Sequence, residues 1–334
     1  MTFAVRIAGA DIVFPCEADE SVLNAAERAG YALPYSCRKG VCSSCEGALI
    51  EGAATVGSEQ IRGPRDAILF CRAKPTSDVV IAPQRIEKRD PLARKRISAR
   101  VYRLTRPAPD VAILQLRFPA SIRAQFRAGQ YLRVIMPDGD SRNFSMANPP
   151  QQSDGAELHI RHVPGGRFSE TVLASLRAND TLNVEIPFGE FFLRDGVQPI
   201  ILLATGTGFA PIKAIVEDMI KRGIRRPATL YWGARSEVDL YLPALIAKWS
   251  AQASWLRTVL VLSEPGTVWA GQAGLVHRAV LNDFPNLSQH QVYACGNPLM
   301  IEAARADFAA IGKLPATAFY ADPFVATGDP AAGQ

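Results

Sequence analysis

The chain has 334 residues and a formal charge of +5, with 37 Lys and Arg against 32 Asp and Glu. This length is enough for two or three domains that each bury a core, so disulfide staples are not needed. The charge is mild and no basic stripe is interleaved with aromatic residues, which argues against a nucleic-acid partner. No segment approaches the roughly 18 apolar residues of a membrane span, and the start MTFAVRIAGADIVF has no charged head before a long apolar run. We therefore expect a cytoplasmic protein with no membrane partner.

Residues 1–84 are predicted to form a small α+β domain. Its expected elements are strands at Phe3–Ile7 and Asp11–Phe14, a helix at Glu20–Gly30 and a strand at Ser77–Pro83. Gly30 is placed to end the helix. The basic segment at 85–96 is interpreted as a solvated linker rather than a binding site for a polyanion.

Residues 97–195 show the period-two alternation of apolar and polar residues that is typical of strands. The runs lie at 97–104, 111–118, 130–137, 157–163 and 181–187, separated by Pro, Gly and Asp turns. We expect an antiparallel β-barrel there. Over 196–334, apolar strands at 199–206, 227–234, 256–264 and 291–296 alternate with helices such as 210–223, which indicates a parallel, doubly wound sheet. The small-residue tail Thr327–Gln334 is expected to be frayed.

Four cysteines have the spacing of an electron-transfer site. Cys37, Cys42 and Cys45 form the pattern C-x4-C-x2-C, and Cys71 follows further along the chain. This is the plant-type arrangement for a 2Fe-2S cluster, in which four thiolates converge on two irons. A zinc site fits less well because no histidine is nearby and the usual separated C-x2-C pairs are missing. A disulfide knot is disfavoured in a reducing cytosol.

Small residues between these cysteines support the cluster prediction. Gly40 allows a sharp bend, and Ser43 and Ser44 let backbone amides approach the sulfurs. Cys16 ends an apolar run and lies outside the loop spacing, so it is interpreted as a packed core thiol.

A candidate flavin or nucleotide site lies in two segments, GDSRNFSMANPP (139–150) and HIRHVPGGRFSETV (159–172). Taken alone, an Arg beside small polar residues is compatible with an ordinary barrel rim. In the second segment, however, Gly165 and Gly166 lead into Ser169 at the start of a helix-like stretch, and such a helix start offers amides to a phosphate. Arg142 can contact phosphate oxygens through two donors, and Phe144 can lie against a planar ring.

A candidate dinucleotide site begins with LLATGTGFAP (202–211), an apolar strand that leads into glycines and a helix. Gly206 and Gly208 allow a tight turn and the close approach of a pyrophosphate, while Pro211 suits the first helical turn. A lone glycine pattern is a weak signal, but this one follows the first strand of the doubly wound pattern. The usual acidic residue about twenty positions later is not evident.

Later strand ends add further candidates to the dinucleotide site. WGARSE and VLSEPG offer Arg235, Ser263 and Glu264, and YACGNP puts Cys295 and Gly296 at the carboxyl end of a late strand. Ligands bind at that edge of such sheets. On the residues alone, Cys295 is also compatible with a simple buried thiol.

These three patches, in this order, resemble the single-chain reductases of Rieske non-haem iron oxygenases. The combination includes the cysteine loop, GQY (129–131), Arg142–Ser145, GTGFAP and CGNP (295–298). The stretches CRKG, SMANPP, RHVPGGRFS, GTGFAPIK, WGAR and LYLP look most like reductases that serve dioxygenases of aromatic acids. The resemblance implies a β-grasp 2Fe-2S ferredoxin domain, a FAD-binding barrel and an NAD(P)-binding sheet.

The resemblance also implies roles for individual residues. The implied flavin-binding residues are Arg142, Phe144, Ser145, Ile160, Arg161, Gly166, Arg167, Phe168 and Ser169. The implied dinucleotide-binding residues are Gly206, Thr207, Gly208, Arg235, Glu264, Cys295, Gly296 and Pro298, with Cys295, Thr207 and Phe324 near the position of hydride transfer. The family usually has Tyr where this chain has Phe144, so a hydrogen bond to the flavin is missing and FAD binding is expected to be weaker.

The implied activity is electron transfer. A hydride from NADH or NADPH reaches FAD, and single electrons pass through the cluster to a Rieske oxygenase. The alternatives are the reductase of a diiron monooxygenase or of a deoxysugar dehydrase, and a redox-sensing iron–sulfur module without turnover. Arg38 and Lys39 beside the cluster loop are expected to form the docking face for the oxygenase. Glu264 would repel a 2′-phosphate and favours NADH, whereas Arg235 favours NADPH.

Overall fold

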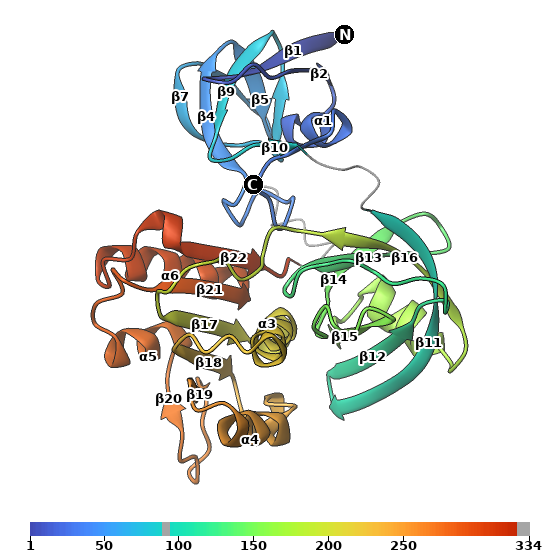
Figure 1. The fold of residues 1–334 in the computed structure, drawn as a ribbon, viewed down its shortest axis with the longest axis vertical. Coiled ribbons are helices and arrows are strands. Elements are labelled where there is room, and N and C mark those ends of the chain that lie inside the picture. The colour runs from blue at the N-terminus through green and yellow to red at the C-terminus, as the bar shows by residue number, and fades with distance from the viewer. Residues whose placement is uncertain (89–93, 326–334) are drawn as a thin grey trace. The chain divides into compact units, whose positions relative to one another are not determined.

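The computed structural model describes residues 1–88 and 94–325 (Figure 1). Contacts divide these residues into two units, one on either side of the undescribed segment 89–93. The predicted frayed tail Thr327–Gln334 and residues 89–93 of the predicted linker lie outside the described residues. Strand β10 (Glu87–Lys88), which pairs with β3 (Tyr31–Ala32), and the start of β11 at Lys95 lie within the 85–96 stretch. No helix in the described part of the chain combines the length and apolar character that a membrane crossing requires.

The N-terminal unit contains a mixed five-stranded sheet in the order β2-β1-β9-β4-β7. These strands are β1 (Thr2–Ile7), β2 (Val13–Glu17), β4 (Glu46–Glu51), β7 (Arg65–Leu69) and β9 (Val79–Pro83). Strands β1 and β9 run parallel and the other pairs are antiparallel. A small second sheet contains β5 (Ala53–Val56), β6 (Glu59–Arg62) and β8 (Ala73–Pro75). This is the predicted β-grasp arrangement.

Helix α1 (Val22–Arg28) lies within the predicted helix Glu20–Gly30 and is two residues shorter at each end. The Ser21 hydroxyl accepts a hydrogen bond from the Asn24 amide at 3.3 Å, which satisfies a free donor of the first turn. After the helix, Gly30 adopts a φ of +82°, the left-handed conformation that ends many helices. Cys16 is fully buried, as expected for a core thiol.

The second unit begins with a six-stranded sheet in the order β14-β13-β16-β11-β12-β15. Its strands are β11 (Lys95–Ala108), β12 (Val111–Arg117), β13 (Tyr131–Ile135), β14 (Ser141–Ser145), β15 (Gly155–Arg161) and β16 (Thr181–Phe188). Every pair is antiparallel. A bridge between Met146 and Leu158 brings the two edge strands together, so the sheet curls into the predicted barrel around an apolar core.

The rest of the second unit is a parallel sheet in the order β20-β19-β18-β17-β21-β22. Its strands are β17 (Ile200–Thr205), β18 (Ala228–Ala234), β19 (Leu256–Leu262), β20 (Gln272–Ala273), β21 (Gln291–Gly296) and β22 (Phe319–Pro323). We call this part the nucleotide half and the preceding barrel the flavin half.

Helices cover both faces of the parallel sheet. Residues of α3 (Phe209–Arg222) and α4 (Pro243–Gln252) pack into one apolar core, and residues of α5 (Val276–Asp283) and α6 (Pro298–Ala310) pack into another. The predicted doubly wound sheet is confirmed. The chain winds outward from β17 to β20 and then returns to β21 on the other side of β17. The carboxyl ends of β17 and β21 therefore form the switch point where such sheets bind ligands.

Candidate functional site

Four cysteine thiols gather in the N-terminal unit. The thiols of Cys37 and Cys42 are hydrogen-bonded to each other, as are those of Cys45 and Cys71, and the Cys42 sulfur interacts with the second pair. All six cysteines are free, so no disulfide knot is present. Two adjoining pairs of thiols fit a two-iron cluster better than one zinc ion.

Backbone amides point at these sulfurs. The Lys39 amide donates to Cys37 Sγ at 3.3 Å, and the Gly40 amide donates to the Cys71 sulfur. Gly40 has a φ of +83°, which a side chain would strain, so the predicted bend is present. Amide donors of this kind stabilise the negative charge of a thiolate-bound cluster.

Within the first pair of cysteines, the shared hydrogen bond favours the thiolate of Cys37 and raises the pKa of Cys42. A hydrogen bond from the Cys42 thiol lowers the pKa of Cys37 to about 7, although burial opposes this shift. The Ser44 hydroxyl is hydrogen-bonded to Cys42. Since iron binds the thiolate, a Cys37 thiol that ionises near neutral pH is prepared for the cluster.

Arg38, one of the two residues expected at the docking face, makes contacts within the N-terminal unit. Its guanidinium forms a hydrogen-bonded ion pair with Glu27 of α1, donates to Asn24 Oδ1 at 3.0 Å and lies 4.0 Å from the centroid of the Tyr35 ring. Its side chain is only 18% exposed. Arg38 therefore anchors the cysteine loop to the helix, a contact that no local sequence pattern reveals.

The glycine loop occupies the switch point of the nucleotide half. Residues Gly206–Gly208 form a short 3-10 turn between β17 and α3. A Cβ on Gly208 would lie 2.6 Å from the Cα of Gly296 and closer still to the Cys295 carbonyl. Only glycine fits there, so the loop lies directly against the end of β21. Thr207 in the loop is buried.

The end of β21 supplies the other wall of this site. Cys295 is fully buried, and burial raises the pKa of its thiol well above the ordinary value. The next residues are fixed by hydrogen bonds, since Asn297 N donates to Thr205 Oγ1 at 2.9 Å and Phe324 N donates to the Gly296 carbonyl at 2.8 Å. Pro298 is the first residue of α6. The structure thus brings Cys295, Gly296, Phe324 and the glycine loop together.

Arg235 and Glu264 follow the ends of adjacent strands β18 and β19. The Glu264 amide donates to the Arg235 carbonyl at 2.9 Å, which places the two residues side by side. Both are exposed. In a sheet of this order, they lie on the side of the glycine loop where the adenosine ribose of a dinucleotide binds.

Two arginines from the predicted flavin segments meet at one turn of the flavin half. Arg142 in β14 donates to Asp140 Oδ2 at 2.7 Å, and Arg167 donates to the same oxygen at 3.3 Å and also pairs with Asp138. The two segments thus meet at Asp140, where the two guanidinium groups are paired with the carboxylates of Asp138 and Asp140. Such a pair of guanidinium groups suits a pyrophosphate.

The loop after β15 is held in place by hydrogen bonds between the side chain of Ser169 and the backbone of the same loop. Ser169 Oγ accepts from the Val163 amide at 3.2 Å and lies 3.1 Å from the Val163 carbonyl. The helical segment runs from Arg167 to Ser175, its first part a π-helical turn, so Ser169 lies inside the first turn. The Ser169 hydroxyl shapes the loop, and the amides of the first turn are the groups that suit a phosphate.

The aromatic and remaining flavin candidates have distinct places. The Phe144 ring packs against Phe168 with centroids 4.7 Å apart, and Ser145 Oγ donates to Asp322 Oδ2 of β22 at 3.4 Å. Ile160 is buried in the barrel core. Ser145 therefore links strand β14 of the flavin half to the nucleotide half.

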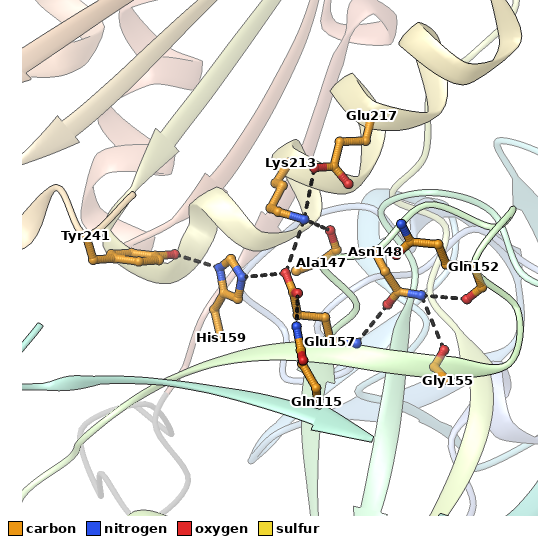
Figure 2. Close-up of polar contacts among 10 residues, drawn as sticks. All are labelled: Gln115, Ala147, Asn148, Gln152, Gly155, Glu157, His159, Lys213, Glu217 and Tyr241. Carbon is orange, nitrogen blue, oxygen red and sulfur yellow. Dashed lines mark hydrogen bonds and ion pairs between the residues drawn. The ribbon is translucent and has the colours of Figure 1, made fainter. Parts of the chain in front are cut away.

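A buried polar network between the two halves was missed by the sequence interpretation (Figure 2). Glu157 Oε1 lies 3.1 Å from Lys213 Nζ and 3.1 Å from His159 Nε2, and His159 Nδ1 lies 2.9 Å from the Tyr241 hydroxyl. Gln115 Nε2 donates to Glu157 Oε2 at 3.0 Å. Glu157 and His159 belong to β15 of the barrel, whereas Lys213 and Tyr241 belong to the nucleotide half.

The network has a defined protonation state. Burial lowers the pKa of His159, so its imidazole is neutral at neutral pH. Burial alone would raise the pKa of Glu157, but the hydrogen bond from His159 and the positive charge of Lys213 lower this pKa well below its usual range. Burial also raises the pKa of Tyr241. The phenol therefore donates to Nδ1, and the Nε2 hydrogen of His159 is donated to the Glu157 carboxylate.

Three family models match successive parts of the chain. Residues 5–76 match a 2Fe-2S iron-sulfur cluster binding domain, residues 98–193 an oxidoreductase FAD-binding domain and residues 202–306 an oxidoreductase NAD-binding domain. The chain is 45% identical over 332 residues to the reductase component 1 of terephthalate 1,2-dioxygenase from Comamonas sp., covering 97% of this chain and 98% of that one. The chain belongs to the family of oxygenase reductase components.

Two further similarities place this reductase among its relatives. It is 35% identical to the CDP-6-deoxy-L-threo-D-glycero-4-hexulose-3-dehydrase reductase of Yersinia pseudotuberculosis, covering 97% of this chain and 99% of that one. The crystal structure of the Amycolatopsis cytochrome P450 reductase GcoB superposes with a TM-score of 0.78 at 27% identity, covering 98% and 100% of the two chains. The predicted cofactors are confirmed at the level of domains: the reductase is an NAD(P)H-dependent oxidoreductase with FAD and 2Fe-2S cluster domains.

Proposed function

We propose that the reductase takes a hydride from NADH and delivers single electrons to a Rieske dioxygenase that acts on an aromatic acid, with terephthalate as the first candidate. One observation carries the proposal: strand β15 of the flavin half and the glycine loop at Gly206–Gly208 meet within one unit. A Cβ on Gly206 would lie 3.0 Å from Arg161 Nη2. Arg161 comes just before residues 163–169, which we call the flavin loop. A relative that is 45% identical and named for terephthalate 1,2-dioxygenase supports the choice of partner.

The residues of the chain have separable tasks in this proposal. Arg142 and Arg167 would hold the FAD pyrophosphate, whose charge replaces that of the aspartates as their partner. Gly206 and Gly208 would admit the pyrophosphate of NADH. FAD, when bound, accepts two electrons as a hydride and releases them one at a time.

The remaining residues would keep water out of the hydride site and carry electrons out through the cluster. The buried Cys295 and Thr207 form the floor of the hydride site and exclude water from it. Phe324, whose amide donates a hydrogen bond to the Gly296 carbonyl, would lie beside the flavin. The four thiolates of Cys37, Cys42, Cys45 and Cys71 would hold the cluster through which electrons leave.

The contacts of Arg38 decide which residue can test the hypothesis that Arg38 and Lys39 form the docking face for the oxygenase. A charge reversal at Arg38 would break its bonds to Glu27 and Asn24 and disturb the cysteine loop. Lys39→Glu is therefore the better probe of docking. A docking role predicts slower oxygenase turnover at low salt and an unchanged rate with ferricyanide as acceptor.

An anaerobic titration with NADH tests the electron chain. Bleaching of the flavin absorbance followed by reduction of the cluster supports the proposal, and zinc in place of iron contradicts it. The partner is tested by combining the reductase with the oxygenase component of a terephthalate dioxygenase and measuring NADH oxidation and dihydroxylated product together. Turnover with a deoxysugar dehydrase or a diiron hydroxylase instead would reject the Rieske partner but keep the electron chain.

A further inference from the structure

Strand β15 of the flavin half presents three polar side chains to the nucleotide half. Glu157, His159 and Arg161 are alternate residues, so they share one face of the strand. They reach Lys213 on α3, the Tyr241 hydroxyl and the neighbourhood of Gly206, respectively. The residues between them, Leu158 and Ile160, fill the barrel core. One strand thus contacts the nucleotide half at three successive points.

These three contacts connect two segments that are proposed to bind cofactors. β15 continues directly into the flavin loop at 163–169, and α3, which carries Lys213, begins directly after the glycine loop. Lys213 is also held by the Ala147 carbonyl at 3.1 Å and by Glu217 at 3.1 Å (Figure 2). The ammonium group therefore has a fixed place between the strand and the helix.

Tyr241 extends the contact to the glycine loop. Its ring meets Trp232 edge-on at 5.2 Å between centroids, and Trp232 stacks on Phe209 at 3.9 Å. The Trp232 indole also donates to the Gly206 carbonyl at 3.2 Å. A displacement of His159 would thus be transmitted through packed rings to the loop that holds the dinucleotide.

We propose that Glu157 and His159 are positioning residues that, through Lys213 and Tyr241, fix the distance between the flavin loop and the dinucleotide loop for hydride transfer. The inference rests on the proposed function. A hydride passes only between atoms held about 3–3.5 Å apart, and a misplacement of about 1 Å can reduce the rate about 100-fold. The His159 side chain is completely buried and that of Lys213 is only 10% exposed, so water cannot replace these contacts.

The test uses the FAD-loaded holoenzyme and single-turnover reduction of its flavin by NADH without oxygen. Lys213→Met removes the ammonium group and keeps the length of the side chain, and Lys213→Arg restores a cation. Tyr241→Phe removes one hydroxyl and keeps the ring contacts. Arg257→Met is the matched control, because it breaks an ion pair with Asp283 that lies wholly within the nucleotide half.

The expected result for Lys213→Met is a limiting rate of flavin reduction that is about 10-fold to 100-fold lower, with an unchanged Kd for NADH. The charge-transfer absorbance between nicotinamide and flavin should weaken in parallel. Tyr241→Phe should show a smaller decrease, Lys213→Arg a partial recovery, and Arg257→Met the wild-type rate.

A purely structural role gives a different result. Variants that melt earlier but reduce their flavin at the wild-type rate, with the normal charge-transfer absorbance, would overturn the inference. If Lys213→Met does not retain FAD, Tyr241→Phe alone decides between the two outcomes. Failure of NADH to bleach the flavin of the wild-type holoenzyme would instead reject the proposed function.

Discussion

Glu264 and Arg235 place opposite charges side by side at the ends of two adjacent strands. We predict that Glu264→Gln raises kcat/KM for NADPH about fivefold relative to NADH, because it removes about 1 kcal/mol of repulsion of the 2′-phosphate at an exposed site. Arg235→Met should have the opposite effect. Initial-rate kinetics with both cofactors measure this, and a wild-type preference for NADPH would contradict the assignment of Glu264.

Phe144 offers a second test on the scale of one residue. Its ring already packs against Phe168, so Phe144→Tyr adds a hydroxyl to a placed ring. If that hydroxyl bonds to the flavin, the Kd for FAD should fall about fivefold, which corresponds to about 1 kcal/mol for one hydrogen bond. Fluorescence titration of the FAD-free protein measures the change. Phe144→Leu is the control, and it should weaken binding because the ring contact is lost.

The residues that could be predicted from the sequence are those whose spacing is local. Cys37, Cys42 and Cys45 are close in the sequence, and a single loop brings them together. The role of Arg38 could not be predicted, since its partner Glu27 lies on a helix before the loop. An exposed cation and an anchoring cation look the same in a sequence.

Among the elements, the glycine loop has little room for change, because it lies directly against the end of β21. Gly208→Ala would place a Cβ 2.6 Å from the Cα of Gly296, and neither backbone can move without disturbing β21. We predict a loss of about 1–3 kcal/mol in the free energy of unfolding together with a raised KM for NADH.

Gly266→Ala is the control for this substitution, because a Cβ there meets nothing within 4 Å. Chemical denaturation and steady-state kinetics measure both effects. An unchanged KM for NADH in a destabilised Gly208→Ala variant would mean that the loop shapes the fold but does not hold the dinucleotide.

The predicted elements were the ones with a clear apolar pattern. The parallel strands are nearly continuous apolar runs, and four of them were identified from that pattern. Strand β14 was missed because its sequence SRNFS has no alternation, and it forms only at the edge of the sheet against β13. Its pairing is specified by the neighbouring strand rather than by its own residues.

For the whole molecule, the buried network makes stability depend on pH. Burial lowers the pKa of His159, so below the ordinary histidine value of about 6.5 the unfolded chain binds a proton that the folded chain does not. Glu157, whose pKa is lowered, stabilises the fold above about pH 4.3 and loses this effect only at a lower pH. The free energy of unfolding should therefore fall as the pH decreases from 7 to 5.

The contribution of His159 can be separated from that of other groups. Burial also lowers the pKa of His277 and of His290, so they add to the same slope. His159→Gln should reduce the slope by at most about 1.4 kcal/mol per pH unit, the value for one proton. His162→Gln, at an exposed imidazole, is the control. Equal slopes for wild type and His159→Gln in denaturation curves at several pH values would refute this account.

The order of the three modules could be predicted because each carries its own motif, but the way two of them join could not. The segment ELHIRHV fits a barrel strand, and polar residues at alternate positions usually face water. Here that polar face is covered by α3 and Tyr241, whose residues come more than fifty positions later. Such a pairing depends on tertiary contacts that leave no local pattern.

Strand β15 also limits how the sequence can change in length. The gain or loss of a single residue within Gly155–Arg161 would exchange the two faces of the strand. His159 would then enter the barrel core, and Leu158 would meet Lys213. By contrast, residues 265–268 are all exposed, and an insertion there is expected to be tolerated. Descendants of this sequence can therefore diverge in the length of their surface loops while the spacing from Glu157 to Arg161 stays constant.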